Sequence, residues 1–399
     1  MHMIRMLGLV VVTGLISACG GGDSSQQPVQ EQEQVKPQPD LALGSLAVVS
    51  QDNDRTALSL YDLSQNKTVL HTPLKQLPLA IYSSPNYGYA VMMDRVAGEV
   101  SFVAAGQQPK ILDYRLYGAA PTHYRQVNGQ AAVFYDGSDT QVSKFDVFSD
   151  QDIAKGLVAS QHLPYKHHGV AEPRGNMVLS SYLAEGETQV SMVKSYAQHG
   201  DHYHEEQTLT HACPSLHGAA SNQNFIAFGC QDGVLLVEQQ GQRFIDTKIT
   251  TPVRIGTLLG HEKVSDLVAI ASTQQELFIV DTDQQQADMV VWNNQDLKRL
   301  KQNFSSTGQY FVILDDQGGL SILDSNTWQV LHYVPVLSQD ALAQAQLAMH
   351  GTQDQVFIND ANTKKIVQID LSTGQIVQRI QLDVVPQQMA WLKHSNDAK

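Results

Sequence analysis

The amino-acid sequence predicts an all-β fold built from about eight repeated units. Three observations lead to this prediction: short apolar segments recur at a regular spacing, turn-forming residues lie between them, and no segment shows convincing helical periodicity. The chain has 399 residues, 42% of them hydrophobic, which is enough to bury a sizeable core. That length fits either two ordinary domains or one large repeat architecture, and the regular spacing favours the second.

The repeated element is a run of three mostly apolar residues, and successive runs are centred 41 to 49 residues apart. The eight runs lie at 47–49, 89–91, 132–134, 177–179, 226–228, 267–269, 311–313 and 356–358. Turn signals such as Asn128-Gly129 precede most of them, and a second strand such as 320–325 follows. Each unit is therefore expected to hold three to four antiparallel strands and no helix, which is typical of a β-propeller blade.

The two ends of the repeat region predict how the fold closes. Residues 385–391 resemble the first strand of a further unit, whereas the first unit, which starts near Ser45, lacks such a strand. Pairing the two would complete that unit and remove an exposed sheet edge. We therefore expect eight blades closed by the C-terminal strand. Seven blades is the alternative if one unit is an irregular insertion, and a pair of β-sandwiches fits the regular period less well.

The N-terminal segment predicts export. Residues 1–18 combine Arg5 with a short apolar stretch that is too short to span a bilayer as a helix. The ending Ile16-Ser17-Ala18-Cys19 resembles a bacterial lipobox, which implies cleavage before Cys19 and lipidation of its thiol. An ordinary signal peptide with a chance cysteine is the alternative. Gly20 follows the cysteine, and by analogy with lipoprotein sorting this predicts a periplasmic protein anchored to the outer membrane of a Gram-negative cell.

The composition divides the rest of the chain into two parts. Residues 19–42 are rich in Gly, Gln, Pro and Glu with few apolar side chains, so this segment is predicted to be a flexible tether. Residues 43–399 form the folded body. The whole chain carries 26 basic and 40 acidic residues, a net charge of −14, which argues against nucleic acid or an anionic lipid surface as partner. Membrane contact is expected only through the lipid anchor, whereas cationic partners such as metal ions are compatible with this charge.

Three histidines occupy one position of consecutive repeats. Counting ten residues back from the centre of the third, fourth and fifth runs gives His123, His168 and His217. Equivalent positions of neighbouring blades face one another around a central channel, so three imidazoles are expected to converge and to leave a fourth coordination position open. Such a site suits Zn²⁺ and, less selectively, Cu²⁺, Ni²⁺ or Co²⁺. The alternative is that each imidazole binds a backbone carbonyl in a turn.

Other polar residues are candidates for additional ligands or for hydrogen-bond partners of the ligands. His167, Asp136 and Glu172 lie near the three histidines in sequence, and counting seven residues back in a later repeat places His261 near the same face.

A second group of histidines lies in the segment 199–206. His202 and His204 alternate with Tyr203 and would share one face of a strand. In a loop they would instead form a mobile metal-collecting arm, and a solvated polar hairpin is the alternative.

Two cysteines remain if Cys19 carries lipid. An oxidising compartment favours their pairing, and a turn centred on Ser221-Asn222 would place Cys213 and Cys230 opposite each other across a hairpin. A disulfide there would hold the strand that carries His217. Two buried free thiols are the alternative.

Several of these motifs together resemble a known family. They are PTH at 121–123, HHGVA at 167–171, CPSLHG at 213–218, FGCQDG at 228–233 and RIGTLLGH at 254–261. They are similar to motifs of the periplasmic zinc metallochaperones of the AztD type, which are β-propellers that hand zinc to the solute-binding protein of a zinc ABC importer. The resemblance implies Zn²⁺ as the metal, His123, His168 and His217 as its ligands, a Cys213–Cys230 pair and that solute-binding protein as partner. It also places residues 199–206 where a His-rich mobile loop is expected.

The function expected from these features is zinc binding and delivery without enzymatic activity. An interaction scaffold, in which the histidines play no part, is the alternative. An enzyme is disfavoured because the sequence shows no Ser-His-Asp order, no usefully spaced carboxylate pair and no cofactor fingerprint.

Overall fold

The computed structural model describes residues 43–106, 108–273, 275–293 and 296–394. They belong to one compact unit, Pro39–Lys399. The predicted leader 1–18, the lipidation site Cys19 and the tether 19–42 lie outside the described residues. Within the described ranges, none of the helices has the length and apolar character needed to cross a membrane.

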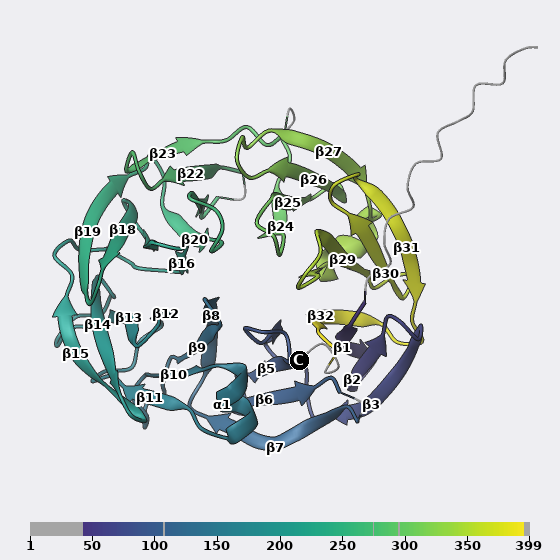
Figure 1. Cartoon of the computed structure of the whole chain (residues 1–399), viewed down its shortest axis with the longest axis horizontal. Helices are drawn as coiled ribbons and strands as arrows, with labels where there is room; N and C mark the ends of the chain where they lie inside the picture. The colour runs from purple at the N-terminus through teal and green to yellow at the C-terminus, as the bar shows by residue number, and fades with distance from the viewer. Residues whose placement is uncertain (1–42, 107, 274, 294–295, 395–399) are drawn as a thin grey trace, which may run out of the picture. The chain divides into compact units, whose positions relative to one another are not determined.

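Six sheets of the described part contain four antiparallel strands each, which confirms the all-β prediction (Figure 1). In spatial order, the first two sheets contain β3 (Lys67–Leu74), β2 (Arg55–Asp62), β1 (Ser45–Asp52) and β32 (Pro386–Leu392), and β4 (Ala80–Ser83), β5 (Tyr89–Asp94), β6 (Glu99–Ala104) and β7 (Lys110–Tyr117). The next two contain β16 (Ala219–Ser221), β17 (Phe225–Cys230), β18 (Gly233–Gln240) and β19 (Arg243–Thr250), and β20 (Ile255–Leu259), β21 (Leu267–Ala271), β22 (Leu277–Asp281) and β23 (Gln286–Met289). The last two contain β24 (Arg299–Phe304), β25 (Tyr310–Asp315), β26 (Gly319–Asp324) and β27 (Val330–Pro335), and β28 (Leu347–Met349), β29 (Gln355–Asp360), β30 (Lys365–Asp370) and β31 (Gln375–Gln381).

A seventh sheet has eight strands. Their order is β12 (Ala171–Arg174), β13 (Met177–Tyr182), β14 (Met192–His199), β15 (His202–Thr208), β11 (Ala159–His162), β10 (Lys144–Phe148), β9 (Gln130–Tyr135) and β8 (Pro121–Val127). The sheet consists of two four-stranded groups that are joined only where β11 and β15 run parallel, at the pair Ser160 and His202. It therefore holds two repeats, consistent with a propeller.

The apolar runs found in the sequence form β1, β5, β9, β13, β17, β21, β25 and β29. Each of these strands pairs with a neighbour on both sides, and both of its faces pack against apolar side chains. In β25, for example, Phe311, Val312 and Ile313 are all fully buried. A strand covered on both faces needs a continuous apolar run rather than alternation, which explains why these runs stand out in the sequence.

The first and last strands lie in the same sheet. β32 pairs antiparallel with β1, with Ala390 opposite Ala47, and thus supplies the fourth strand of that sheet. Trp391 of β32 donates its Nε1–H to the carbonyl oxygen of Leu43 at 2.9 Å. The two ends of the described chain are held together by backbone and side-chain bonds.

Eight buried hydrophobic clusters connect the four-stranded groups. Seven of these clusters each draw their residues from two groups that follow each other along the chain, as Phe102 of β6 and Tyr135 of β9 do. The remaining cluster joins Phe357 of β29 to Trp391 of β32 and so connects the last group to the first. Buried apolar contacts therefore link every four-stranded group to the next one along the chain, and the last group to the first.

The expectation of no helix was wrong at two places. Helix α1 (Asp150–Lys155) follows β10, and the short 3₁₀ segment η1 (Gln339–Gln344) precedes β28. The start of α1 is fixed by a capping box, in which Ser149 and Asp152 bond each other's backbone N–H, and its end by Gly156 in the left-handed region at φ 68°. These signals are local and span only a few residues, so they carry no helical periodicity.

A cavity of about 530 Å³ lies where one edge strand from each four-stranded group meets the others. Each of the eight groups contributes one lining strand, namely β4, β8, β12, β16, β20, β24, β28 and β32. Side chains at corresponding places on these strands therefore face a common space, which is the arrangement on which the histidine prediction depends.

Candidate metal centre

The three predicted histidines lie together, although only one of them is in a strand. His123 lies in β8, His168 lies three residues before β12, and His217 lies two residues before β16. The sequence interpretation placed all three at one register of the innermost strands. β12 and β16 start later than expected, so His168 and His217 are held by the segments that lead into those strands.

The backbone around His217 is fixed by a short ladder. His217 donates its N–H to the carbonyl oxygen of Gly229 at 2.9 Å, and Gly229 donates its own N–H to Gly218 at 3.1 Å. Gly218 has φ 75°, a left-handed conformation that side chains with a Cβ rarely adopt. The glycine after His217 is therefore required by the turn that directs this imidazole toward the other two.

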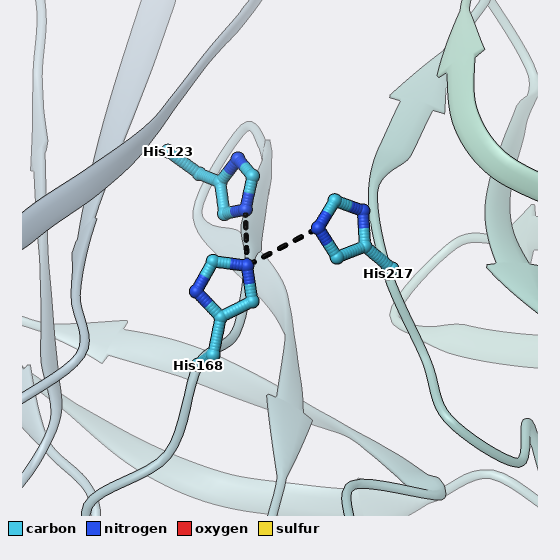
Figure 2. Close-up of side chains that lie close together, drawn as sticks. All are labelled: His123, His168 and His217. Carbon is cyan, nitrogen blue, oxygen red and sulfur yellow. Dashed lines mark hydrogen bonds between the residues drawn. The ribbon is translucent and has the colours of Figure 1, made fainter. Parts of the chain in front are cut away.

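The three imidazoles converge through their Nε2 atoms (Figure 2). The Nε2 atom of His168 lies 3.1 Å from that of His123 and 3.3 Å from that of His217. One nitrogen from each ring lies within 4.8 Å of the others. Two nitrogens bound to one tetrahedral Zn²⁺ at ordinary Zn–N distances are about 3.3 Å apart. The two separations that involve His168 thus already match the spacing that such an ion requires.

The second nitrogen of two rings determines which nitrogen carries the proton. His168 Nδ1 donates to Asp136 Oδ2 at 3.0 Å, and His217 Nδ1 donates to the carbonyl oxygen of Gly256 at 2.6 Å. Carboxylate and carbonyl oxygens only accept, so in the neutral rings both Nε2 atoms carry a lone pair. Two lone pairs that face each other at 3.3 Å repel, and a cation between them would turn this contact into an attraction.

Burial keeps two of the imidazoles uncharged. Burial, reinforced by the charge of Arg125, lowers the pKa of His123 to about 2. Burial also lowers the pKa of His217, against the opposing effect of its bond to Gly256. A metal ligand must be deprotonated, so these two rings are ready to bind at neutral pH without releasing a proton.

Asp136 holds His168 in place. Burial alone would raise the pKa of Asp136, but hydrogen bonds from His168 and Arg95 outweigh it and lower that pKa below its usual value. Arg95 donates to Asp136 Oδ2 at 2.7 Å and to the carbonyl oxygen of Ala120 at 3.2 Å. Sequence reasoning named Asp136 as a candidate but missed Arg95 and Gly256. Arg95 comes from the preceding four-stranded group, and no sequence motif connects it to His168.

The other candidates near this centre have different partners. His167 is buried, with Nδ1 3.0 Å from the carbonyl oxygen of Tyr165 and Nε2 near Ser181. Glu172 accepts a hydrogen bond from Ser221 at 2.7 Å and lines the central cavity. His261 Nε2 lies 3.2 Å from the carbonyl oxygen of Ser306. The structure does not bring these side chains into the histidine cluster.

The second histidine group lies on a β-hairpin. His202 and His204 both belong to β15, and their Nε2 atoms are 3.1 Å apart. His199, at the end of β14, pairs with His202, and its ring lies 4.8 Å from that of His204. All three side chains are exposed. The prediction that His202 and His204 share a strand face agrees with this arrangement.

Cys213 and Cys230 form a disulfide. The predicted geometry differs in one respect, because the β16–β17 turn centres on Gln223-Asn224, as the pairing of Ala219 with Phe228 shows. Cys213 therefore lies in the loop before β16, where its N–H bonds Ser191, and Cys230 ends β17. Cys230 directly follows Gly229, which holds His217, so the disulfide still supports the histidine centre.

The fold and the donor set define an all-β protein with a preassembled three-histidine cluster suited to a divalent metal. Among known proteins, the chain is similar to the zinc chaperone AztD of Citrobacter koseri, with 26% identity over 162 residues. The aligned segment spans 38% of this chain and 37% of that protein's length. No family model matches the chain.

Solved structures extend the likeness in fold to most of the chain. The apo structure of AztD from Citrobacter koseri matches with a TM-score of 0.73 and 18% identity, over 88% of this chain and 98% of that one. A second crystal structure of that protein matches with a TM-score of 0.74 and 17% identity, over the same shares of the two chains. The dihydro-heme d1 dehydrogenase NirN matches with a TM-score of 0.59 and 10% identity, over 92% and 82%. One fold therefore serves different functions, and the function of this chain must be argued from its site.

Proposed function

We propose that this protein is a non-enzymatic zinc chaperone that captures Zn²⁺ with His123, His168 and His217. The observation that carries the proposal is the convergence of the three imidazoles, in which the Nε2 atoms of His168 and His217 face each other at 3.3 Å while both Nδ1 atoms point to oxygen acceptors. This arrangement is unfavourable in the free protein and favourable around a cation. The similarity to a zinc chaperone supports zinc as the cargo.

Three imidazoles leave the fourth position of a tetrahedral zinc ion open. His168 keeps 45% of its side chain exposed, so a ligand from another protein has access to that position. Transfer would proceed by ligand exchange, in which the incoming group binds at the open position before an imidazole leaves. We propose the solute-binding protein of a zinc ABC importer as the recipient.

The proposed setting follows from the sequence and the fold. The chain would be an eight-bladed propeller closed by β32, because six sheets hold four strands and the seventh holds two such groups. Residues 1–18 would direct export, and Cys19 would carry lipid that anchors the protein to the outer membrane of a Gram-negative cell, on the periplasmic side. In this setting the tether 19–42 lets the propeller reach its partner.

Zinc titration of the metal-stripped protein against a chromophoric chelator tests the proposal. We expect tight one-to-one binding that is lost when His123, His168 and His217 are all changed to Ala. The matched control changes the exposed His199, His202 and His204 to Ala and should keep the tight site. Equal, weak binding by the triple variant and the unmodified protein would contradict the proposal and favour a scaffold.

Delivery needs a separate experiment. Zinc-loaded protein is mixed with the metal-free solute-binding protein, the two are separated, and zinc is measured in each. Transfer faster than the spontaneous release of zinc to a chelator would support direct handover. Transfer at the release rate would indicate storage rather than delivery.

A further inference from the structure

A second cavity lies beside the histidine centre, apart from the central one. Its volume is about 560 Å³, and residues of three segments line it, namely 95–98, 117–120 and 137–141. We call it the lateral pocket. None of the three histidines lines either cavity, so the pocket is a separate feature of the surface.

The lateral pocket and the histidines lie at the same edge of the sheets. Segment 95–98 joins β5 to β6, segment 117–120 leads from β7 into β8, and segment 137–141 follows β9. Because these neighbouring strands are antiparallel, all three connections lie at the edge where β8 begins, and His123 is the third residue of β8. A group held in the pocket therefore lies on the face of the protein that carries the histidine centre.

Arg95 connects the lateral pocket with that centre. It lines the pocket, and its guanidinium donates to Asp136 Oδ2 at 2.7 Å. The same oxygen accepts the Nδ1–H of His168 at 3.0 Å. The side chains of Arg95 and His168 are 40% and 45% exposed. One carboxylate oxygen thus bridges the wall of the pocket and the most accessible of the three imidazoles.

Two large apolar side chains at the pocket are exposed to solvent. Val96 is 87% exposed, the highest value for a large apolar side chain in the described part of the chain, and Tyr117 is 64% exposed. Single exposed apolar residues are common on protein surfaces. Here two of them line one cavity next to an exposed candidate metal ligand, and aromatic side chains in such positions are typical anchors of protein–protein interfaces.

The backbone of the lateral pocket is held in place by its own hydrogen bonds. Gly118 donates its N–H to the carbonyl oxygen of Gly98 at 3.1 Å, and Gly137 donates to that of Ala119 at 3.0 Å. Ala119 in turn donates its N–H to Gln141 Oε1 at 3.2 Å. A surface that is already ordered loses little conformational entropy when a partner binds.

We propose that the lateral pocket is the docking site of the protein that accepts zinc, and that this acceptor places an apolar side chain against Val96 and Tyr117. The inference rests on the proposed function in zinc delivery. An acceptor must bring a ligand of its own to the open coordination position, so it must cover the surface beside the exposed His168. A second copy of this chain is a poor occupant, because each copy carries a net charge of −14.

Transfer kinetics of pocket variants test the proposal. Zinc-loaded Val96→Asp and Tyr117→Ala are mixed with the metal-free solute-binding protein of a zinc ABC importer at several concentrations. We expect the second-order rate constant of transfer to fall at least tenfold for Val96→Asp, which sets a charge against an apolar side chain, and about three- to tenfold for Tyr117→Ala. Both side chains are exposed and outside the histidine cluster, so zinc affinity in a chelator competition should stay within about threefold.

The matched controls carry the same substitutions elsewhere on the surface. Val291→Asp lies between β23 and β24, and Tyr333→Ala lies in β27, with 71% and 51% of the side chains exposed. Neither residue lines the lateral pocket. Both controls should transfer zinc at the rate of the unmodified protein.

The outcomes separate this proposal from zinc delivery itself. Fast transfer by the unmodified protein and by both pocket variants would overturn the docking site and leave delivery intact. Transfer by the unmodified protein at the rate of spontaneous release would contradict delivery, and the docking site with it. Self-association of the unmodified protein that Val96→Asp abolishes would instead assign the pocket to a second copy of this chain.

Discussion

His168 donates its Nδ1–H to Asp136 Oδ2 at 3.0 Å, and this bond decides what the opposite nitrogen of the ring can do. With its proton held at Nδ1, the neutral imidazole presents a lone pair at Nε2 toward the other two histidines. Arg95 fixes the carboxylate in turn, at 2.7 Å. The orientation of the His168 ring toward the other two histidines therefore depends on residues outside the histidine cluster.

The first prediction concerns Asp136. Asp136→Ala removes the acceptor that orients His168, and we expect zinc affinity to fall about 10- to 100-fold, as is usual when the partner of a ligating histidine is lost. Competition with a chelator measures the change. The matched control is Asp139→Ala, since Asp139 is exposed and pairs with Lys166. An Asp136→Ala affinity within twofold of the unmodified protein would show that His168 is oriented by other contacts.

The second prediction concerns the pH dependence of zinc binding. Protons compete with zinc only near or below the pKa of each ligand, and burial lowers the pKa of His123 to about 2 and that of His217 below its usual value. We therefore expect fewer than three protons to be released per zinc at pH 5.5. Affinities measured between pH 7.5 and pH 5.5 give this number as their slope. A slope of three would mean that all three imidazoles titrate as exposed ones do.

The third prediction concerns fold stability. Burial lowers the pKa of His350 to about 4, below the value of about 6.5 for an unfolded chain. Because the unfolded state binds the proton more tightly, the free energy of unfolding should fall as the pH drops from about 6.5 to about 4. The full loss from this residue is about 3 kcal/mol. Above about pH 6.5, His350 should not make the free energy of unfolding depend on pH.

Urea unfolding of His350→Gln between pH 7 and pH 4 checks this expectation. As the pH falls, the free energy of unfolding of the variant should decrease less steeply than that of the unmodified protein. His162→Gln is the control, because His162 is exposed at the end of β11 and should leave the slope unchanged. Parallel slopes for His350→Gln and the unmodified protein would contradict the assignment.

The fourth prediction concerns the disulfide. Cys213 and Cys230 are 17 residues apart, and a crosslink closing a loop of that size contributes about 3 kcal/mol in the chain-entropy model. Changing both cysteines to Ser should lower the free energy of unfolding by about this amount. It should also weaken zinc binding several-fold, because Gly229, which holds His217, loses its anchor. Full zinc affinity in a folded double variant would mean that the backbone ladder alone positions His217.

The strands could be predicted from the sequence because the buried middle strands are apolar on both faces. The run at 311–313, for example, is fully covered in the structure. The convergence of His123, His168 and His217 could also be predicted, because a constant repeat length converts equal spacing in sequence into proximity in space. Small errors in the expected strand boundaries do not change this proximity. β12 and β16 start after His168 and His217, yet the three rings still lie together.

The partners of those histidines could not be predicted in the same way. Arg95 reaches Asp136 from another four-stranded group, and Gly256 offers a backbone carbonyl, which any residue type could supply. Such contacts depend on loop conformations and on side-chain reach rather than on the repeat.

The fifth prediction concerns the effect of Arg125 on zinc. The charge of Arg125 lowers the pKa of both His123 and His217, so the same charge must also disfavour a divalent cation at those rings. Arg125→Gln should therefore tighten zinc binding about three- to tenfold at low ionic strength, and added salt should reduce the gain. The control Arg115→Gln should leave affinity unchanged. Weaker zinc binding by Arg125→Gln would mean that the guanidinium supports the histidine cluster rather than opposing the metal, because loss of a purely repulsive charge cannot lower affinity.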